Sequence, residues 1–465
     1  MNIKYYDTII LGAGASGMTS AIFAAGSGQS VCVVEHRSEP GKKLLQTGNG
    51  KCNLTHENIC SFDYPENFKD DNMPGSGGDG KGKKNGSPVK EGYVYEFLDT
   101  AFGKFGFKKT VEFFNTIGIP VRNKGGYIYP YSGTALSVRN ALWDEMKRLG
   151  VEIITGEEPD LKIHDGEFSL SVRSLSHHIK GKRLILATGL KAFPGTGSDG
   201  SGLEIAKKAG IKIKPVLPAL VKLKCKDKIC GPAAGVRHIC SLIMNIGEAN
   251  GSKYDHDNSN ETPKDEDMVS VTSGASEKYE ETGEVQFTDD GISGIPVFNL
   301  SRYASIAVFN GRKVSVTLDL VPDFNNEECR SFIERNFEKM KDRKIVSLFG
   351  GWIHPKLLTA VARTLSISAE KKVVAVGKEK LLRLVRTFKA WEMEIDSTYG
   401  FESAQVCTGG VDVSLIDPET MEVRSHPGIF VTGEICDIDG PCGGYNLQWA
   451  WTSGAIAGMF DPSKQ

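Results

Sequence analysis

A glycine-rich turn near the start of the sequence most constrains what this chain can fold into. Gly12, Gly14 and Gly17 form the pattern G-x-G-x-x-G between an apolar stretch at 6–11 and a helical pattern at 18–25. In a β–α–β unit the first glycine makes the tight turn, the second lets a pyrophosphate approach the backbone, and the third lets helix and strand pack closely. The turn therefore predicts a dinucleotide site.

An acidic residue follows where such a site needs one. Glu35 ends a second apolar stretch at 30–34, and a carboxylate at this place binds the ribose hydroxyls of an adenosine. Arg37 and Lys43 come shortly after it and can neutralise phosphate groups. We interpret 6–35 as a β–α–β unit that binds the adenosine half of a dinucleotide.

Two segments farther along the chain favour FAD over NAD. The run LILATG at 184–189 predicts a strand that ends in a turn of small residues, and the run GIFVTGEICDID at 428–439 places Glu434 after another strand. A helix predicted at 447–459 begins after Gly443-Gly444, and its N-terminal amides can stabilise negative charge on a reduced flavin. FAD is long enough to need these later segments, whereas NAD is not.

The sequence contains no second G-x-G-x-x-G turn with a strand before it and a helix after it. A dedicated nicotinamide domain is therefore not expected, and NADH or NADPH would act as a transient co-substrate. Alternatively, the substrate reduces the flavin, and oxygen or another acceptor reoxidises it.

Charge and composition exclude several classes of protein. The 56 Lys+Arg against 58 Asp+Glu give a net charge of -2, which lacks the basic excess of a nucleic-acid or anionic-membrane binder. No apolar run of about 18 residues and no secretory signal pattern occurs, and the 10 cysteines lack paired CxxC spacing. We expect a cytoplasmic protein with a small-molecule substrate, no nucleic-acid or membrane partner and no bound metal.

Six stretches together carry a family resemblance. The chain resembles the BaiN-like flavoproteins, also described as NAD(P)/FAD-dependent oxidoreductases or aminoacetone oxidase family FAD-binding enzymes. The matching stretches cover most of the chain outside two polar insertions: GAGASG at 12–17 with Glu35, GKKLLQTGNGKCNLT at 41–55, LATGLKAFPGTGSDGSG at 186–202, PALVKL at 218–223, FTDDGISGIP at 287–296, and 408–454 with GEICDIDG and GGYNLQWAWTSG.

The resemblance implies an α/β fold: a discontinuous Rossmann-type (glutathione-reductase-like) FAD-binding domain with an inserted β-barrel and a helical segment. The expected ranges are 1–217 for the first part of the FAD domain, 218–323 for the barrel, 324–396 for the helical segment and 397–465 for the second part. Two flexible polar insertions are expected at about 65–91 and 250–281.

FAD contacts are expected at the positions of these motifs. They are Gly12, Gly14, Ala15, Ser16, Gly17, Glu35, His36, Arg37, Lys43, Gly48, Asn53, Ala187, Thr188, Gly189, Gly433, Glu434, Gly444, Asn446 and Leu447.

Three residues are candidates for catalysis. Lys51 follows a glycine turn that the resemblance places close to the flavin ring, where it could fix a flavin carbonyl or a substrate anion. Tyr131 ends the run YIYPY, in which alternate tyrosines share one face of a strand, and its hydroxyl could act as an acid. Asp289 stands where the family often has a histidine, which leaves a proton-transfer role at this place in doubt.

Cysteines and tryptophans near the C-terminus allow two interpretations each. Cys436 and Cys442 could form a redox pair or be ordinary buried thiols, and the latter is favoured because nothing in their spacing is diagnostic. Trp449 and Trp451 indicate either a different substrate or different packing of the last helix.

The function expected from these features is an FAD-dependent oxidoreductase that moves a hydride through flavin N5. The resemblance favours an NAD(P)H-linked reductase of an enone such as a 3-oxo-Δ4 bile acid or steroid. An amine or aminoketone oxidase that uses oxygen is the alternative within enzymes. A flavin-bound RNA-associated or binding protein is the alternative from another class, and the near-neutral charge disfavours it.

Overall fold

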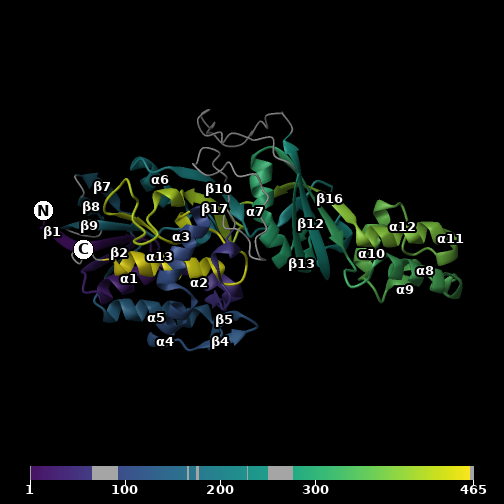
Figure 1. Cartoon of the computed structure of the whole chain (residues 1–465), viewed down its shortest axis with the longest axis horizontal. Coiled ribbons are helices and arrows are strands. Elements are labelled where there is room, and N and C mark those ends of the chain that lie inside the picture. The colour runs from purple at the N-terminus through teal and green to yellow at the C-terminus, as the bar shows by residue number, and fades with distance from the viewer. Residues whose placement is uncertain are drawn as a thin grey trace, which may run out of the picture. The chain divides into compact units, whose positions relative to one another are not determined.

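The computed structural model describes residues 2–64, 93–164, 167–173, 177–227, 229–249 and 276–460. The chain forms two compact units, one made of Met1–Leu217 with Val406–Gln465 and the other of Pro218–Gln405 (Figure 1). The predicted insertion at 65–91 lies outside the described residues, as do 250–275 of the second predicted insertion.

A seven-stranded sheet forms the centre of the first unit. Its strand order is β6-β2-β1-β9-β8-β7, and β18 pairs with the end of β9. The strands β6, β2, β1, β9 and β18 run parallel, whereas β8 and β7 are antiparallel. All five residues of β2 are buried, as expected for an inner parallel strand. The strands are β1 (Asn2–Leu11), β2 (Val31–Glu35), β6 (Glu152–Thr155), β7 (Asp160–His164), β8 (Glu167–Ser171), β9 (His177–Leu186) and β18 (Ile429–Val431).

Helices α1 (Ala15–Gly26) and α13 (Tyr445–Met459) come from opposite ends of the sequence and pack against each other. Glycines on α13 let the backbones of the two helices contact each other directly. A Cβ added to Gly454 would lie 2.5 Å from the carbonyl oxygen of Ser16, and one added to Gly458 would lie 2.5 Å from that of Ser20. Neither position has room for a side chain, so this contact fixes the distance between the two helices.

The remaining elements of the first unit surround this sheet. The short strands β3, β5 and β4 form a three-stranded sheet, and β10 pairs with β17. Thr134 is the N-cap of helix α5, and its hydroxyl accepts a hydrogen bond of 3.2 Å from the amide of Leu136. The elements are α2 (Lys42–Gln46), β3 (Thr55–His56), α3 (Tyr93–Phe105), α4 (Phe107–Thr116), β4 (Val121–Lys124), β5 (Tyr127–Pro130), α5 (Ala135–Arg148), α6 (Ser201–Lys208), β10 (Ile213–Ala219) and β17 (Val406–Val411).

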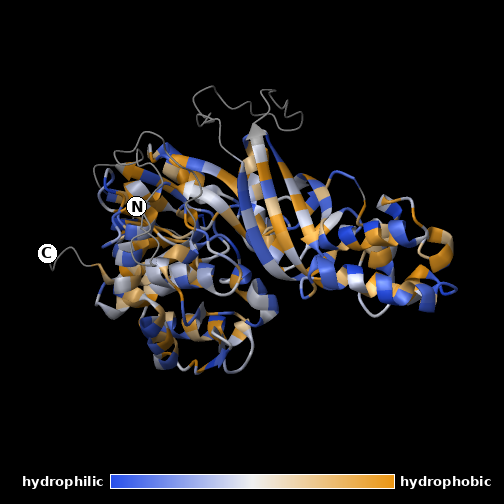
Figure 2. Ribbon diagram, turned by 45° about the vertical axis from the view of Figure 1, so that its right-hand side comes forward, coloured by the Kyte–Doolittle hydropathy of each residue, from blue (hydrophilic) through white to orange (hydrophobic). Residues whose placement is uncertain are grey.

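The second unit contains a closed antiparallel barrel with the strand order β11-β14-β13-β12-β15-β16. Hydrophobic and hydrophilic residues alternate along its strands (Figure 2), as the two-residue period of a strand with one buried face requires. The barrel elements are β11 (Leu223–Cys225), β12 (Arg237–Ala249), β13 (Glu277–Phe287), β14 (Gly291–Ser293), β15 (Arg312–Asp319) and β16 (Trp391–Thr398), with helix α7 (Ile295–Phe309) between β14 and β15.

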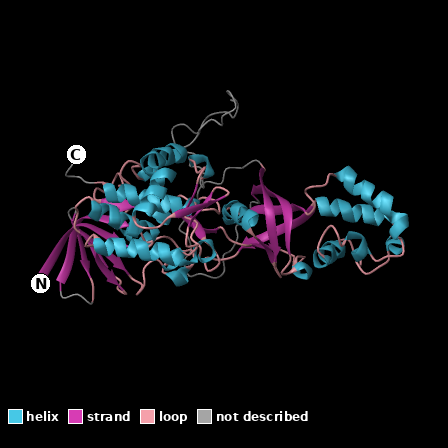
Figure 3. Ribbon diagram, turned by 90° about the horizontal axis from the view of Figure 1, so that it is seen from below, coloured by secondary structure: helices cyan, strands magenta, loops and turns pink. Residues whose placement is uncertain are grey.

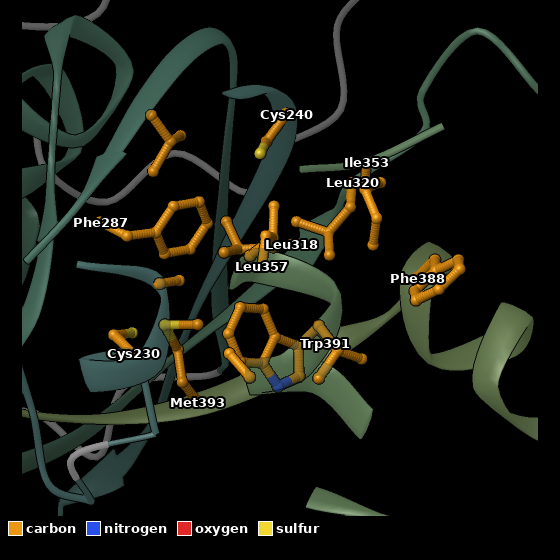
Figure 4. Packing of buried hydrophobic residues seen from close by; sticks show 14 of the residues in the cluster. Cys230, Cys240, Phe287, Leu318, Leu320, Ile353, Leu357, Phe388, Trp391 and Met393 are labelled. Atoms are coloured by element: carbon orange, nitrogen blue, oxygen red, sulfur yellow. The ribbon is translucent and has the colours of Figure 1, made fainter. Parts of the chain in front are cut away.

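Five helices follow β15 in the chain and precede β16. They form a helical group next to the barrel strands (Figure 3). Their apolar faces join the barrel interior in one hydrophobic core, in which Trp391 lies near Phe287 (Figure 4). Phe388 packs edge-on against Phe349 in the same core. The helices are α8 (Asn326–Met340), α9 (Ile345–Phe349), α10 (Pro355–Thr364), α11 (Val373–Val376) and α12 (Lys378–Lys389).

Two expectations about this unit are wrong at their edges. Residues 277–281 were expected in a flexible insertion, yet they begin β13 and pair with residues 242–246 of β12. Residues 391–396 were expected at the end of the helical segment, yet they form β16, whose buried Trp391, Met393 and Ile395 alternate with exposed charged residues. In both places the pairing partners, which lie far away in sequence, decide the structure.

The contact between α1 and α13 gives the first testable prediction. Gly454→Ala should lower the free energy of unfolding by about 1–3 kcal/mol, because the new methyl group meets a backbone carbonyl that cannot move freely. Gly103→Ala on α3 is the matched control, since no atom lies within 4 Å of its added Cβ. It should stabilise by about 0.5–1 kcal/mol through helix propensity. Urea unfolding of both apoproteins tests this, and stabilisation by both substitutions would contradict it.

Candidate functional site

The glycine-rich turn lies between β1 and α1, and its three glycines differ in what surrounds them. A Cβ added to Gly12 would lie 2.6 Å from the carbonyl oxygen of Ala187, and one added to Gly17 would lie 2.0 Å from that of Gly12. At Gly14 the nearest such atom is 4.0 Å away, and the backbone is extended with φ -81°. The protein itself requires glycine at 12 and 17 but leaves open space at 14, as a bound ligand would need.

The carboxylate of Glu35 is buried and holds this turn in place. Its Oε2 accepts a hydrogen bond of 2.8 Å from the amide of Ala13, and its Oε1 accepts one of 2.8 Å from the amide of Arg37. His36 Nε2 and Arg37 Nε are buried without a hydrogen-bond partner among the described residues. His36 Nε2 lies 3.8 Å from Asp199 Oδ2, so Arg37 Nε is the atom of the two that remains available to another group.

The C-terminal part of the unit meets the turn at Gly433. A Cβ added there would lie 2.5 Å from Ser16 Oγ, and this hydroxyl donates a hydrogen bond of 3.4 Å to the carbonyl of Thr432. The amide of Gly433 donates to Ser453 Oγ at 2.9 Å, and Trp449 Nε1 donates to the carbonyl of Gly433 at 3.0 Å. The predicted positions Ser16 and Gly433 are therefore direct neighbours.

Glu434 joins three segments that are far apart in sequence. Its Oε1 accepts a hydrogen bond of 3.0 Å from the amide of Cys407, and its Oε2 forms an ion pair with Lys43 on α2. A Cβ added to Gly189, which has φ +69°, would lie 3.4 Å from Glu434 Oε2 and 3.6 Å from Lys43 Nζ. The predicted residues Lys43, Gly189 and Glu434 thus meet at one place.

The positions before Gly189 also pack closely. A Cβ added to Gly202 would lie only 1.8 Å from Thr188 Oγ1, so the α6 backbone approaches Thr188 without a side chain between them. Ala187 lies against Gly12 and Gly17. Ala187 and Thr188 therefore hold the strand end of β9 against the glycine turn and α6.

The loop between α2 and β3 adopts left-handed backbone at four residues. Gly48, Asn49, Gly50 and Cys52 have φ of 56°, 54°, 80° and 57°. The non-glycine residues among them, Asn49 and Cys52, each pay on the order of 1–2 kcal/mol for this conformation. Burial raises the pKa of the Cys52 thiol to about 12, so this thiol stays neutral. Strain of this kind is concentrated at functional sites.

The strained loop ends at Asn53 beside the start of α13. Asn53 Oδ1 is buried, has no hydrogen-bond partner among the described residues and lies 3.0 Å from the Cβ position of Gly444. Asn446 instead closes its own turn, since its side chain accepts from the amide of Gly440 at 2.9 Å and donates to the carbonyl of Gly440 at 2.8 Å. Leu447 follows at a half-buried position.

Both tryptophans of the last helix are packing residues. Trp449 and Trp451 are almost fully buried, and Trp451 Nε1 donates to the carbonyl of Leu54 at 2.9 Å. Trp451 also packs edge-on against Phe114. Of the two interpretations of these residues, the structure supports different packing.

Two of the three catalytic candidates share a pocket. Lys51 and Tyr131 line a hollow of about 200 Å³ on the β4–β5 hairpin, together with Arg122, Lys124, Tyr127 and Tyr129. Tyr131 is 62% exposed. Asp289 lies at an exposed position between β13 and β14 of the second unit, so its predicted role stays a prediction.

Three basic residues near the site were not predicted. Arg139 on α5 lies over Gly41, with its Cγ 2.9 Å from the Cβ position of that glycine, and the amide of Gly41 donates to the carbonyl of Ala13 at 2.9 Å. Arg139 Nε is buried without a hydrogen-bond partner among the described residues. Arg122 and Lys124 line the pocket. In the sequence all three look like ordinary surface charges, and no local signal distinguishes them.

Neither Cys436 nor Cys442, the two cysteines of the possible redox pair, forms a disulfide. Cys436 is fully buried, its burial raises the pKa of the thiol, and its Sγ donates to the carbonyl of Val431, whereas Cys442 is half-buried. Within the described ranges, no group of three or more His, Cys, Asp or Glu side chains is placed to hold a metal ion. None of the helices in those ranges combines the length and apolar character needed to cross a membrane.

Comparison with known proteins decides the family. A family model described as HI0933-like protein Rossmann domain matches residues 6–73 and 89–460. The chain belongs to the HI0933-like family. This result confirms the resemblance to the BaiN-like flavoproteins and the predicted fold class, and it makes the chain an FAD-dependent oxidoreductase.

Curated proteins of two kinds are similar to this chain. The chain is 34% identical to a 3-dehydro-bile acid delta(4,6)-reductase from Clostridium scindens, over 97% of each chain. It is 27% identical to a ribosomal RNA dihydrouridine synthase from Haemophilus influenzae, over 97% of each chain, and 24% identical to one from Escherichia coli, over 97% of this chain and 96% of the other.

The residues of this HI0933-like chain fit FAD. The open space at Gly14 suits a pyrophosphate at the N-terminus of α1. Three buried polar atoms lack a hydrogen-bond partner among the described residues. Arg37 Nε lies next to Glu35, Asn53 Oδ1 lies at the end of the strained loop, and Arg139 Nε lies near the glycine turn. Unsatisfied buried polar atoms are rare in proteins, so atoms of this kind in three segments of the predicted site are consistent with a long polar ligand such as FAD.

The contrast between Gly14 and Gly17 can be tested by substitution. Gly14→Ala should change the stability of the apoprotein by no more than about 1 kcal/mol but weaken FAD binding roughly 10- to 100-fold, because the methyl group fills ligand space only. Gly17→Ala should destabilise the apoprotein itself through its clash with Gly12. Fluorescence titration with FAD and unfolding of the apoproteins measure both effects. Unchanged FAD affinity in Gly14→Ala would be inconsistent with a ligand at this turn.

Proposed function

We propose that this chain is an NAD(P)H-linked FAD-dependent reductase of a carbon–carbon double bond conjugated to a carbonyl, in a small organic molecule such as a 3-oxo-Δ4 bile acid or steroid. The observation that carries the proposal is the 34% identity to a bile acid reductase across almost the whole length of both chains. A dihydrouridine synthase also reduces a double bond conjugated to a carbonyl. The names of both kinds of relative therefore support one reaction class.

In this proposal the first unit binds FAD through the predicted contact residues. The space at Gly14 and the first turn of α1 with Ala15 and Ser16 would receive the pyrophosphate of FAD, and Glu35, which orders the turn, would bind the ribose. Arg139 adds a cation beside the same turn, a role that follows from its position over Gly41. FAD, when bound, supplies hydride transfer at flavin N5.

The strained loop and the start of α13 orient the other end of the cofactor. Asn53 offers a buried oxygen with no partner among the described residues, and Gly444 at the start of α13 lets the backbone of Thr55 and this oxygen approach the helix end closely. The positive end of this 15-residue helix stabilises negative charge placed there. The Lys43–Glu434 pair holds α2 and the strand end of β18 in register with this loop.

Reduction of an enone also needs a donor at the carbonyl oxygen and a proton for the adjacent carbon. Lys51 carries a positive charge and Tyr131 a hydroxyl, and both line the same pocket beside the strained loop. We assign Lys51 to a substrate anion or a flavin carbonyl, and Tyr131 and Asp289 stay the candidates for the proton donor.

A second candidate function is reduction of uridine in ribosomal RNA, which two relatives favour by their names. It differs from the first in substrate class and not in chemistry. The net charge of -2 favours the small-molecule substrate, since RNA binding draws most of its affinity from phosphate contacts by basic residues.

Anaerobic flavin reduction tests the proposed function. The FAD-loaded protein should lose its flavin absorbance when NADH or NADPH is added and regain it when a 3-oxo-Δ4 bile acid follows. A ribosomal RNA fragment and a panel of amines, the latter with a peroxide assay, are the comparison substrates. If neither NADH nor NADPH bleaches the flavin, the proposed reductase activity is contradicted. Peroxide formation from an amine would support the oxidase alternative instead.

A further inference from the structure

The pocket beside Lys51 has an unusual lining. Three of its side chains are cationic, namely Lys51, Arg122 and Lys124, and none of its lining residues is acidic. Within the described ranges, none of the three cations forms an ion pair with a carboxylate. Like charges gathered in one hollow repel each other, so a bound anion would relieve this repulsion.

Aromatic rings lie beside two of these cations, which are exposed on the hairpin. The guanidinium of Arg122 lies 4.2 Å from the centre of the Tyr131 ring, and Lys124 Nζ lies 5.8 Å from the centre of the Tyr129 ring. Burial and the nearby Tyr127 raise the pKa of Tyr129, so its hydroxyl stays protonated and can donate a hydrogen bond. The pocket thus combines exposed positive charge, a neutral donor and flat aromatic walls.

Backbone pairing ties this hairpin to the strained loop of the FAD site. The amide of Leu54 donates to the carbonyl of Ile128 at 2.8 Å, and β3 pairs with β5 through Thr55 and Ile128. The ring of Tyr127 lies 2.8 Å from the Cβ position of Gly443, just before α13. A molecule in the pocket would therefore be held by the same segments that orient the cofactor in the proposed function.

We propose that this pocket binds the carboxylate end of the substrate, a small organic acid whose other end carries the reacting double bond. The inference rests on the proposed function. A pocket of about 200 Å³ is smaller than the roughly 300–1,000 Å³ of sites that enclose a whole ligand. It therefore suits one charged end with part of an apolar body. A single compact cluster of cations fits one carboxylate better than the extended row of phosphates in RNA.

The test compares acidic and neutral ligands in matched variants. Arg122→Gln and Lys124→Gln remove one charge each, Arg122→Lys keeps the charge, and Lys162→Gln removes an exposed charge on the edge strand β7. Each FAD-loaded variant is assayed with a 3-oxo-Δ4 bile acid and with a 3-oxo-Δ4 steroid that lacks the carboxylate. Calorimetry with a saturated bile acid, which cannot be reduced, measures binding without turnover.

We expect Arg122→Gln and Lys124→Gln to raise two quantities about 10- to 100-fold: the KM for the bile acid and the Kd for the saturated bile acid. Each substitution removes a charge-assisted hydrogen bond. The kcat, the FAD content and the KM for the neutral steroid should change less than about twofold, Arg122→Lys should restore part of the affinity, and Lys162→Gln should behave as the unmodified protein. Equal weakening of acidic and neutral ligands, or no change in either, would overturn the proposal.

Two further results separate this inference from the function beneath it. If no enone is reduced but the saturated bile acid binds in a manner that depends on Arg122, the proposed function fails and the pocket assignment stands. If the two Gln variants lose binding to a ribosomal RNA fragment and keep their affinity for the acids, the pocket is an RNA contact and the carboxylate assignment is overturned.

Discussion

The backbone contact between α1 and α13 is the constraint on which the rest of the first unit depends. Gly454 and Gly458 bring α13 against the carbonyls of Ser16 and Ser20 with no side chain between them. At this distance Gly433 reaches Ser16, and Trp449 and Ser453 on α13 bind the backbone of Gly433. A site composed of both ends of the sequence is possible because the two helices meet this closely.

The glycines of the site serve two distinct purposes, and only the structure separates them. At Gly12 and Gly17 the protein's own backbone occupies the space of a side chain, so these residues are required for folding. At Gly14 that space is empty, and the conformation is one that any residue adopts, so the requirement comes from a ligand.

Much of the fold could be predicted because its signals are local. The glycine turn and the strand ends near Glu35 and Gly189 have patterns readable within a few residues, whereas the inserted barrel with its helical segment followed from the family resemblance. The start of β13 escaped prediction because its polar residues are held by pairing with β12. Strand β16 carries an alternating pattern, but it follows a long helical stretch and closes the barrel only through β11 and β15.

The site was predictable in part for the same reason. Lys51 was predictable because it follows a glycine turn that the family resemblance places close to the flavin ring. Arg122 and Lys124 join it only through the register of β3, β5 and β4. Arg139 lies on an amphipathic helix, and only its position over Gly41 in the folded chain indicates that it is near the site. When charged residues from separate elements meet in the folded structure, the sequence of each element alone does not predict that contact.

The central claim is that the two ends of the chain form one FAD site. Hydrogen–deuterium exchange of the apoprotein and the FAD-loaded protein tests this claim most directly. The account predicts that FAD slows exchange together at 12–17, 41–53, 187–189 and 433–447, since one long ligand would contact all four segments. Protection confined to 12–17 and the vicinity of Glu35, with 433–447 unchanged, would show that the C-terminal segments do not hold the cofactor and would contradict the account.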